Sequence, residues 1–495
     1  MKLSLFKTAI MFVLILTTTA YCQHQGLGFS YYGGGARSEG MGQAYIALSD
    51  DGAAGGWNPA GLYVHEKTLM GFSYGSLVPR GYNKYFAAPG RTLKFDHSGN
   101  VGSINDWNII SPLRIKNHHV VLNLSYVRNF DTYFEFREKL YSFSDFDTST
   151  TIDDYDPNAF MQRKGGIHSV SIALGTRIYK QLSFGVSANI YTGSVVTDEV
   201  RTIVYDTAAS IGDAHLVGNF HTIDSTSYGG FNFTLGLLYA SDKFRSGLTL
   251  RTPFILKATS DSTLYMEPTM NDMPAPAYLN GTTFDSDTVY VDNMTSRIEM
   301  PIMLGFGMAY NISDNWLVST DLEYRGFKGK KVENLDSLLL TSTGDRDEFY
   351  SAVDSVPNWS NVIQFRFGTE YLLDTKYGEI PLRLGVRTEA FPSGNIVNYS
   401  VTYESENSAT GTQEFDGATF EEDNRRVNYS FKYDTDKITG YSVSAGTGIH
   451  WSQILLDFAV TYTTYRQSVY QGESNLRSKN RWQNYHFNFG FVGYF

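Results

Sequence analysis

Alternation of apolar residues with small or polar ones constrains this chain more than any other feature. Between residues 168 and 178, Val170, Ile172 and Leu174 alternate with serine, alanine and glycine. Successive side chains of a β-strand point to opposite faces, so such a run forms a strand with one apolar face. The alternation resumes directly after the short turn at Lys180. This pattern predicts a β-hairpin whose two strands are apolar on one side only.

The same unit recurs along the chain. Five hairpins with short turns are predicted, at 168–190, 231–251, 302–325, 365–389 and 441–463. Three earlier runs, near 67–77, 100–110 and 118–128, and a C-terminal run ending at Phe495 have the same period. Together these segments predict about 14 strands.

The connections between the hairpins are much longer than the turns within them. They cover 131–164, 199–228, 257–295, 330–358, 392–438 and 467–481. Short turns at one end of the strands and long loops at the other are typical of outer-membrane β-barrels. We therefore predict an all-β fold, a transmembrane antiparallel β-barrel of about 14 strands over residues 67–495, located in the outer membrane of a Gram-negative cell.

A soluble β-sandwich is the alternative interpretation, because it is also built from alternating strands. The apolar faces, however, carry aromatic residues near the strand ends, such as Tyr239, Trp316 and Tyr441, which is typical of the two membrane interfaces. The opposite faces carry Gly, Ser, Thr and charged residues, which favour a polar lumen over the core of a sandwich.

The N-terminus predicts export. Residues 1–22 combine the basic Lys2 and Lys7, an apolar core at 9–16 and the small residues Ala20 and Cys22, which is the pattern of a cleaved signal peptide. A lipoprotein signal ending at Cys22 is the alternative, but the bulky preceding tyrosine disfavours it. The formal net charge of −11 becomes −13 once both lysines are removed, which argues against a nucleic-acid partner. Beyond the N-terminus no run of 18 apolar residues could form a membrane-spanning helix.

Residues 23–66, between the signal and the first strand, are rich in glycine and alanine. They include GARSEGMGQAYIALSDDGAAGGWNPAGL at 35–62, which is similar to the opening of the FadL/TodX-type outer-membrane transport proteins for long-chain fatty acids and hydrocarbons. Hairpins such as LGLLYASDKFRSGLTLRTPF at 235–254 carry the same resemblance. It implies that residues 23–66 are a hatch plugging the barrel, with Asn58, Pro59, Ala60 and Gly61 at the matched positions.

The resemblance also implies a function and partners. The protein would pass hydrophobic compounds, fatty acids or related hydrocarbons, across the outer membrane by passive diffusion, with hatch rearrangement and exit through the barrel wall. Outer-membrane lipid, lipopolysaccharide and, during biogenesis, the barrel-assembly machinery are expected as partners. Because related barrels in type IX protein secretion share a similar opening, an anchor or shuttle role in that system is the alternative.

Charged residues on the lumen faces are the candidate ligand-binding residues. A guanidinium can bind a carboxylate in a bidentate manner, so Arg251, Arg325, Arg383 and Arg387 are candidates, although pairing with lumen carboxylates is the simpler role.

No enzyme, cofactor or metal is predicted. The GFSYG string around Ser73 matches a nucleophile elbow, but strand alternation continues through it, whereas that motif requires a sharp turn into a helix. His118 and His119 are adjacent in a predicted strand and face opposite sides, so they cannot share a metal ion.

Overall fold

The fold was analysed in a computed structural model of the 495-residue chain. The residues described are 32–495 except 89–90, 99, 117, 132–133, 138–139, 142–154, 157–159, 207–214, 271–272, 275–276, 280–281, 285–286, 335–336, 342–345, 350–358, 377, 406–418, 423–424 and 472–475. The predicted signal peptide and the first residues of the predicted hatch therefore lie outside the described residues.

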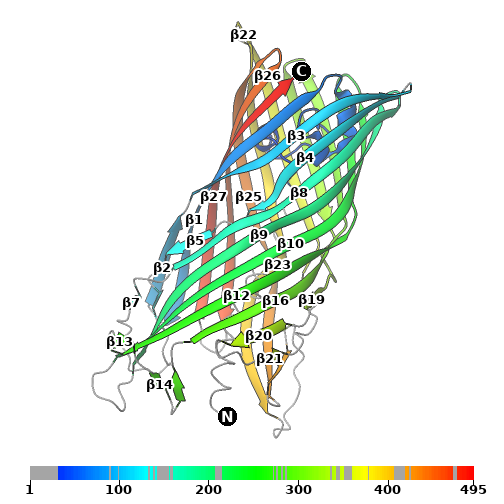
Figure 1. The fold of residues 1–495 in the computed structure, drawn as a ribbon. Coiled ribbons are helices and arrows are strands. Elements are labelled where there is room, and N and C mark those ends of the chain that lie inside the picture. The colour runs from blue at the N-terminus through cyan, green and yellow to red at the C-terminus, as the bar shows by residue number, and fades with distance from the viewer. Residues whose placement is uncertain are drawn as a thin grey trace.

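The described chain forms a closed antiparallel barrel of 14 strand positions, as predicted (Figure 1). We call each position a stave, because some are filled by one strand and others by two consecutive strands. Twelve staves are single strands: β1 (Leu69–Ala88), β3 (Val101–Ile115), β4 (His118–Asp131), β8 (Phe160–Tyr179), β9 (Leu182–Asp206), β10 (His215–Ala240), β18 (Trp316–Arg325), β22 (Val362–Thr375), β23 (Gly378–Ser405), β25 (Arg425–Trp451), β26 (Ile454–Gln471) and β27 (Leu476–Tyr494). Two staves are interrupted: β11 (Phe244–Arg251) with β12 (Phe254–Met270), and β16 (Asp287–Met300) with β17 (Met303–Ser313). Pairing of β1 with β27, from Leu69 opposite Tyr494, closes the barrel.

Shorter strands extend the barrel at its loop end. Those in the main sheet are β2 (Arg91–Ser98), β5 (Phe134–Arg137), β13 (Met273–Pro274), β19 (Val332–Asn334), β20 (Ser337–Thr341), β21 (Arg346–Phe349) and β24 (Thr419–Glu422). Two separate pairs are β6 (Leu140–Tyr141) with β7 (Tyr155–Asp156), and β14 (Ala277–Leu279) with β15 (Thr282–Phe284).

Several predicted loops are in fact strand. Residues 199–206 and 215–228, predicted as a connection, continue β9 and β10, and 257–270 continues β12. Ladder pairs such as Thr222 with Glu199 hold these extensions together. The prediction was wrong there because the apolar alternation stops where the strands leave the hydrocarbon layer, whereas backbone pairing continues in water.

The outer surface of the barrel carries the apolar faces. Phe231, Phe306, Phe365 and Leu384 on four different staves are all more than 40% exposed. In aqueous solution such a surface would be a strong liability, whereas in a membrane acyl chains cover it. The protein is therefore an outer-membrane β-barrel.

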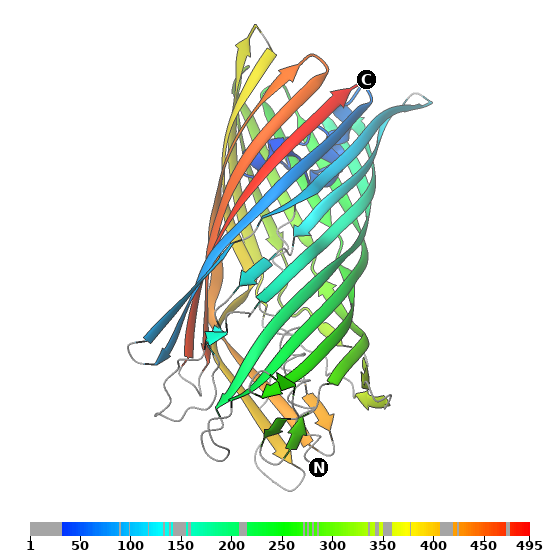
Figure 2. The same ribbon diagram turned by 60° about the vertical axis from the view of Figure 1, so that its left-hand side comes forward.

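Helices are short and few in the described part of the chain. None of those described is long and apolar enough to cross a membrane. They are α2 (Ala36–Gly40), α3 (Ala54–Trp57) and the 3-10 helix η1 (Pro59–Val64), all within the N-terminal segment. Figures 1 and 2 both show this segment inside the barrel, at the end where the C-terminus and the short turns lie.

Candidate functional site

Residues 32–66, here called the lumen segment, are packed against the inner wall of the barrel. α2 contacts β23, β25, β26 and β27, whereas η1 contacts β4, β8, β9 and β10 on the facing wall. All residues from Gly40 to Ser49 are buried. The segment therefore spans the lumen from one wall to the other.

Wall glycines make room for the lumen segment. A Cβ on Gly385 would lie 2.0 Å from the backbone nitrogen of Gly42, and one on Gly185 would lie 2.2 Å from the carbonyl carbon of Pro59. No side chain other than hydrogen fits at such positions. Inward-facing glycines on seven staves meet the segment in this way: Gly175, Gly185, Gly236, Gly247, Gly307, Gly368 and Gly385.

Arg37 of α2 anchors the segment electrostatically. Its guanidinium donates to both carboxylate oxygens of Glu370 on β22, at 3.0 and 2.8 Å, and to Asp50 at 2.6 Å. Asp50 in turn accepts from Arg245 on β11 at 2.6 Å. Such bidentate, charge-assisted contacts are strong, and they also fix the relative orientation of the two side chains. Two wall strands are thereby tied to the segment, β22 through Arg37 and β11 through Asp50.

Backbone amides of the segment are also bound by the wall. Asp321 on β18 accepts from the N–H groups of Tyr45 and Ile46, at 2.7 and 3.0 Å. Glu39 accepts from Thr461 at 3.0 Å and lies 3.6 Å from Arg387. Buried polar groups need hydrogen-bond partners, and the wall supplies them for polar groups that the sparse secondary structure of the segment does not pair.

The ionisation of the segment's acids reflects these contacts. Burial opposes the charge on Asp50, but Arg37 and Arg245 outweigh it, so the pKa of Asp50 lies below its ordinary value. Burial likewise opposes the charge on Glu39, whose pKa is nevertheless lowered by Arg387 and His486. For Asp51 burial dominates, and its pKa is raised.

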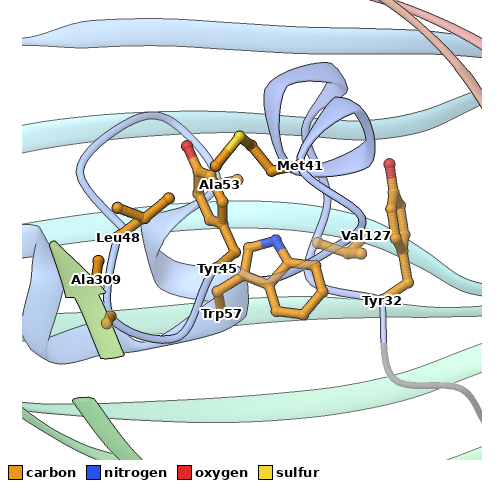
Figure 3. Close-up of a cluster of buried hydrophobic side chains, with 9 residues drawn as sticks. Tyr32, Met41, Tyr45, Leu48, Ala53, Trp57, Val127 and Ala309 are labelled. Atoms are coloured by element: carbon orange, nitrogen blue, oxygen red, sulfur yellow. The ribbon is translucent and has the colours of Figure 1, made fainter. Parts of the chain in front are cut away.

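An aromatic and aliphatic cluster forms the interior of the lumen segment. Trp57 lies between Tyr32 and Tyr45, with ring centroids 6.4 and 6.2 Å away, and its indole N–H donates to the carbonyl of Gly34 at 2.9 Å. Figure 3 shows these rings beside Met41 and Leu48, with Val127 and Ala309 contributed by the wall. The cluster holds the irregular backbone together.

The four residues matched by the resemblance lie at the tight contact with β8, β9 and β10. The side chain of Asn58 accepts from Ala60 N–H at 3.1 Å and donates to the carbonyls of Ile46 and Leu237, at 3.0 and 3.1 Å. Pro59 begins η1, and Gly61 lies against Ser49. All four are buried. That they act as part of a moving hatch stays a prediction.

The four candidate arginines differ in their surroundings. Arg383 bonds Glu370 and Asp457 at 2.5 and 2.6 Å. Arg387 bonds Glu389 at 2.6 Å, and Arg325 bonds Gln364 at 2.9 Å and lies 3.1 Å from Glu323. Arg251 donates to the carbonyl of Gly56 at 3.1 Å and lines a small cavity with Ile46, Trp57, Thr249, Met303, Gly305 and Glu323. Carboxylates thus contact Arg383, Arg387 and Arg325, and Arg251 borders a cavity that Glu323 also lines.

The lumen is not polar throughout, contrary to the sequence prediction. On the loop side of the lumen segment, inward-facing apolar residues form a cluster: Ile167, Leu256, Ile298, Met300, Met303, Phe327, Trp359 and Val362. We call these eight residues the lumen apolar cluster. At the edge of the cluster, Phe254 stacks on Tyr191 with ring centroids 4.8 Å apart. The cluster could not be recognised from the sequence, because its members come from distant staves and a single strand contributes only one or two of them to an otherwise polar face.

The wall is incompletely paired beside this cluster. β3 and β4 pair from Ile115 opposite His118 only as far as Asp106 opposite Val127. Further toward the loops, β3 pairs with β1 and β4 pairs with β8, and within the described residues no ladder joins β3 to β4 there. On another side, the ladder between β18 and β22 ends with Arg325 opposite Val362.

The start of the lumen segment bridges the first of these interruptions. Gly35 N–H donates to Asp106 on β3 at 2.8 Å, and Asn129 on β4 donates to the carbonyl of Tyr32 at 3.2 Å. The hydroxyl of Ser73 also bonds Asp106, from within the uninterrupted strand β1. Ser73 therefore lies within a continuous strand, without the turn into a helix that a nucleophile elbow requires.

The barrel matches known structures. A Pseudomonas aeruginosa FadL homologue aligns with a TM-score of 0.52 and 12% identity, covering 92% of this chain and 97% of that one. The P. putida toluene transporter TodX aligns with a TM-score of 0.54 and 14% identity, covering 94% and 99%. The chain has the FadL-type fold. This FadL-type barrel also matches a family profile described as BamG over residues 140–375, and no curated protein matches it.

Proposed function

We propose that this FadL-type barrel carries hydrophobic compounds across the outer membrane, with the lumen segment acting as a hatch. The observation that carries the proposal is the lumen apolar cluster, an apolar surface inside the barrel and directly on the loop side of the segment. Burying apolar area is the main source of affinity for such compounds. The solved structures of similar fold include a toluene transporter, which is consistent with this proposal.

The proposed route runs from the loop end to the cluster and then sideways through the wall. A compound leaving the cluster faces the unpaired edges of β3 and β4, which are bridged by Tyr32 and Gly35. Movement of the segment would release both edges at once. Passive diffusion suffices, because lateral exit delivers the compound to the hydrocarbon layer. Fatty acids and small hydrocarbons both remain candidate substrates.

Uptake in a deletion strain tests the proposal. Cells lacking the gene are expected to take up labelled long-chain fatty acid or toluene more slowly, and plasmid-borne protein is expected to restore uptake. Ile298→Asn, which places an amide in the cluster, is expected to lower uptake, whereas Thr222→Asn, at a lumen-facing site outside the cluster, serves as the matched control. Equal uptake by deletion and wild-type strains, for both compounds, would refute the proposed function.

An anchor or shuttle role in type IX secretion is the second candidate. Residues 140–375 match a profile described as BamG, so we keep a role other than transport beside the first candidate. Analysis of the protein purified from membranes distinguishes the two roles. A transporter is expected to retain small hydrophobic molecules, whereas an anchor or shuttle is expected to co-purify with polypeptide partners in stoichiometric amount.

A further inference from the structure

A turn between β18 and β19 presents lysines on the outer surface of the barrel. Lys330 N–H donates to the carbonyl of Phe327 at 3.1 Å, and Gly329 has a φ of 76°, which only glycine adopts readily at the third position of such a turn. Phe327 is fully buried in the lumen apolar cluster, edge-on to Trp359 at 5.7 Å. The turn is thereby anchored inside while its lysines, Lys328, Lys330 and Lys331, remain accessible to solvent.

Backbone contacts fix the position of these lysines. Lys328 N–H donates to the side-chain oxygen of Asn361 at 3.0 Å. Lys331 N–H donates to the carboxylate of Glu299 at 3.1 Å, and the carbonyl of Lys331 accepts from Glu299 N–H at 3.0 Å. Because Glu299 alternates with the inward-facing Ile298 and Met300, it marks the outer face of β16. The lysine turn therefore lies on the outer side of the wall.

Two further cations lie in a row beside the turn. The ladders place Lys257 of β12 opposite Arg297 of β16, and Arg297 opposite Glu333 of β19. Directly opposed residues share a face and lie close enough to interact. The Arg297 guanidinium is 3.6 Å from the Glu333 carboxylate, and both side chains are well exposed. Within the described residues, the ammonium groups of Lys257, Lys328, Lys330 and Lys331 form no ion pair.

The row marks the loop-side limit of the lipid-facing surface. On its turn side the outward residues are apolar and exposed, including Phe231, Phe233 and Ile255. On its loop side the outward residues of β10 and β12 become polar, with Ser227 and Thr259 next in register. Loops of such barrels face the cell exterior. The cations are therefore at the level of the headgroups of the outer leaflet.

From this arrangement we infer that Lys257, Arg297, Lys328, Lys330 and Lys331 form a binding site for the phosphates of the outer-leaflet glycolipid, lipid A. Five cations lie beside the carboxylates of Glu299 and Glu333, and both carboxylates already have partners. In a chain of net charge −11 such a local positive excess stands out. Phosphates bind lysine and arginine through charge-assisted hydrogen bonds, and the exposed Phe231 and Ile255 lie where acyl chains would follow.

Titration of lipid-free, refolded protein with purified lipid A tests the site. Binding is followed by native mass spectrometry, with diphosphorylated and with dephosphorylated lipid A as probes. The variant Lys328→Gln/Lys330→Gln/Lys331→Gln is expected to bind diphosphorylated lipid A at least about tenfold more weakly. The matched control Lys116→Gln/Lys180→Gln/Lys243→Gln, on exposed lysines of the short turns at the opposite end, is expected to bind within about twofold of wild type.

Three outcomes would overturn the site. They are unchanged binding by the lysine-turn variant, equal binding of dephosphorylated lipid A by wild type, and equal binding of phosphatidylglycerol, which would indicate a general phospholipid surface. Should the triple variant fail to fold, lipid A binding by Lys257→Gln and the comparison of the two lipid A forms on wild-type protein still test the site. Uptake of hydrophobic compounds is a separate measurement, so this site can fail without affecting the proposed function.

Discussion

Replacing Arg37 with methionine isolates the main anchor of the lumen segment. The change keeps most of the side chain's volume but removes the bonds to Glu370 and Asp50. Removing one partner of a buried ion pair costs 3–5 kcal/mol. Because Glu370 keeps Arg383 and Asp50 keeps Arg245, we take the lower end, about 3 kcal/mol.

The change is expected to lower the free energy of local opening of the segment and to leave the free energy of unfolding of the barrel unchanged. Hydrogen exchange followed by mass spectrometry reports local opening, and 3 kcal/mol corresponds to about 100-fold faster exchange of the amides from Ala36 to Leu62. Exchange in β25 and β26 should stay unchanged. Arg114→Met, at an exposed arginine of β3, is the control. If segment amides in Arg37→Met exchange within about threefold of wild type, the anchor has been assigned wrongly.

Three further predictions concern the seating of the segment. The pKa values of Asp50 and Glu39 are lowered in the folded protein, so their ionised carboxylates stabilise the packed segment fully at neutral pH. This stabilisation is lost as the pH falls below about 4, and amide exchange of the segment should accelerate there while the barrel stays folded. Gly385→Ala should displace the segment, detected as faster exchange, whereas Gly229→Ala, whose Cβ meets nothing within 4 Å, should behave as wild type. Asn58→Ala leaves the Ile46 and Leu237 carbonyls without its amide and should destabilise the segment by about 2 kcal/mol, measured as roughly 30-fold faster exchange; unchanged exchange would contradict it.

Much of the barrel could be predicted from local sequence. Strand alternation depends only on neighbouring residues, so runs such as 168–178 revealed the strands and their lipid-facing sides. The short turns and the closing C-terminal strand were predicted for the same reason. The strand ends at the loop side could not be predicted, because pairing there continues without an apolar face.

The candidate site was only partly accessible to sequence. Inward charges such as Arg383 and Arg387 were identified from alternation, but their partners were not, since Arg383 and Asp457 are 74 residues apart. Gly385 could be noted as an inward glycine, yet nothing local indicates that it faces Gly42. The lumen apolar cluster escaped notice because it combines residues from separate staves, and the same holds for the row that Lys257 and Arg297 form beside the lysine turn.

The sequence by itself determined which side of each strand meets lipid, because that choice is made residue by residue with a period of two. Only the tertiary structure decided what fills the barrel. Arg37 and Glu370 are 333 positions apart, and their contact exists because closing the barrel brings β22 around to the N-terminal segment. Closure is a property of all staves together, so no local pattern encodes which lumen residues meet.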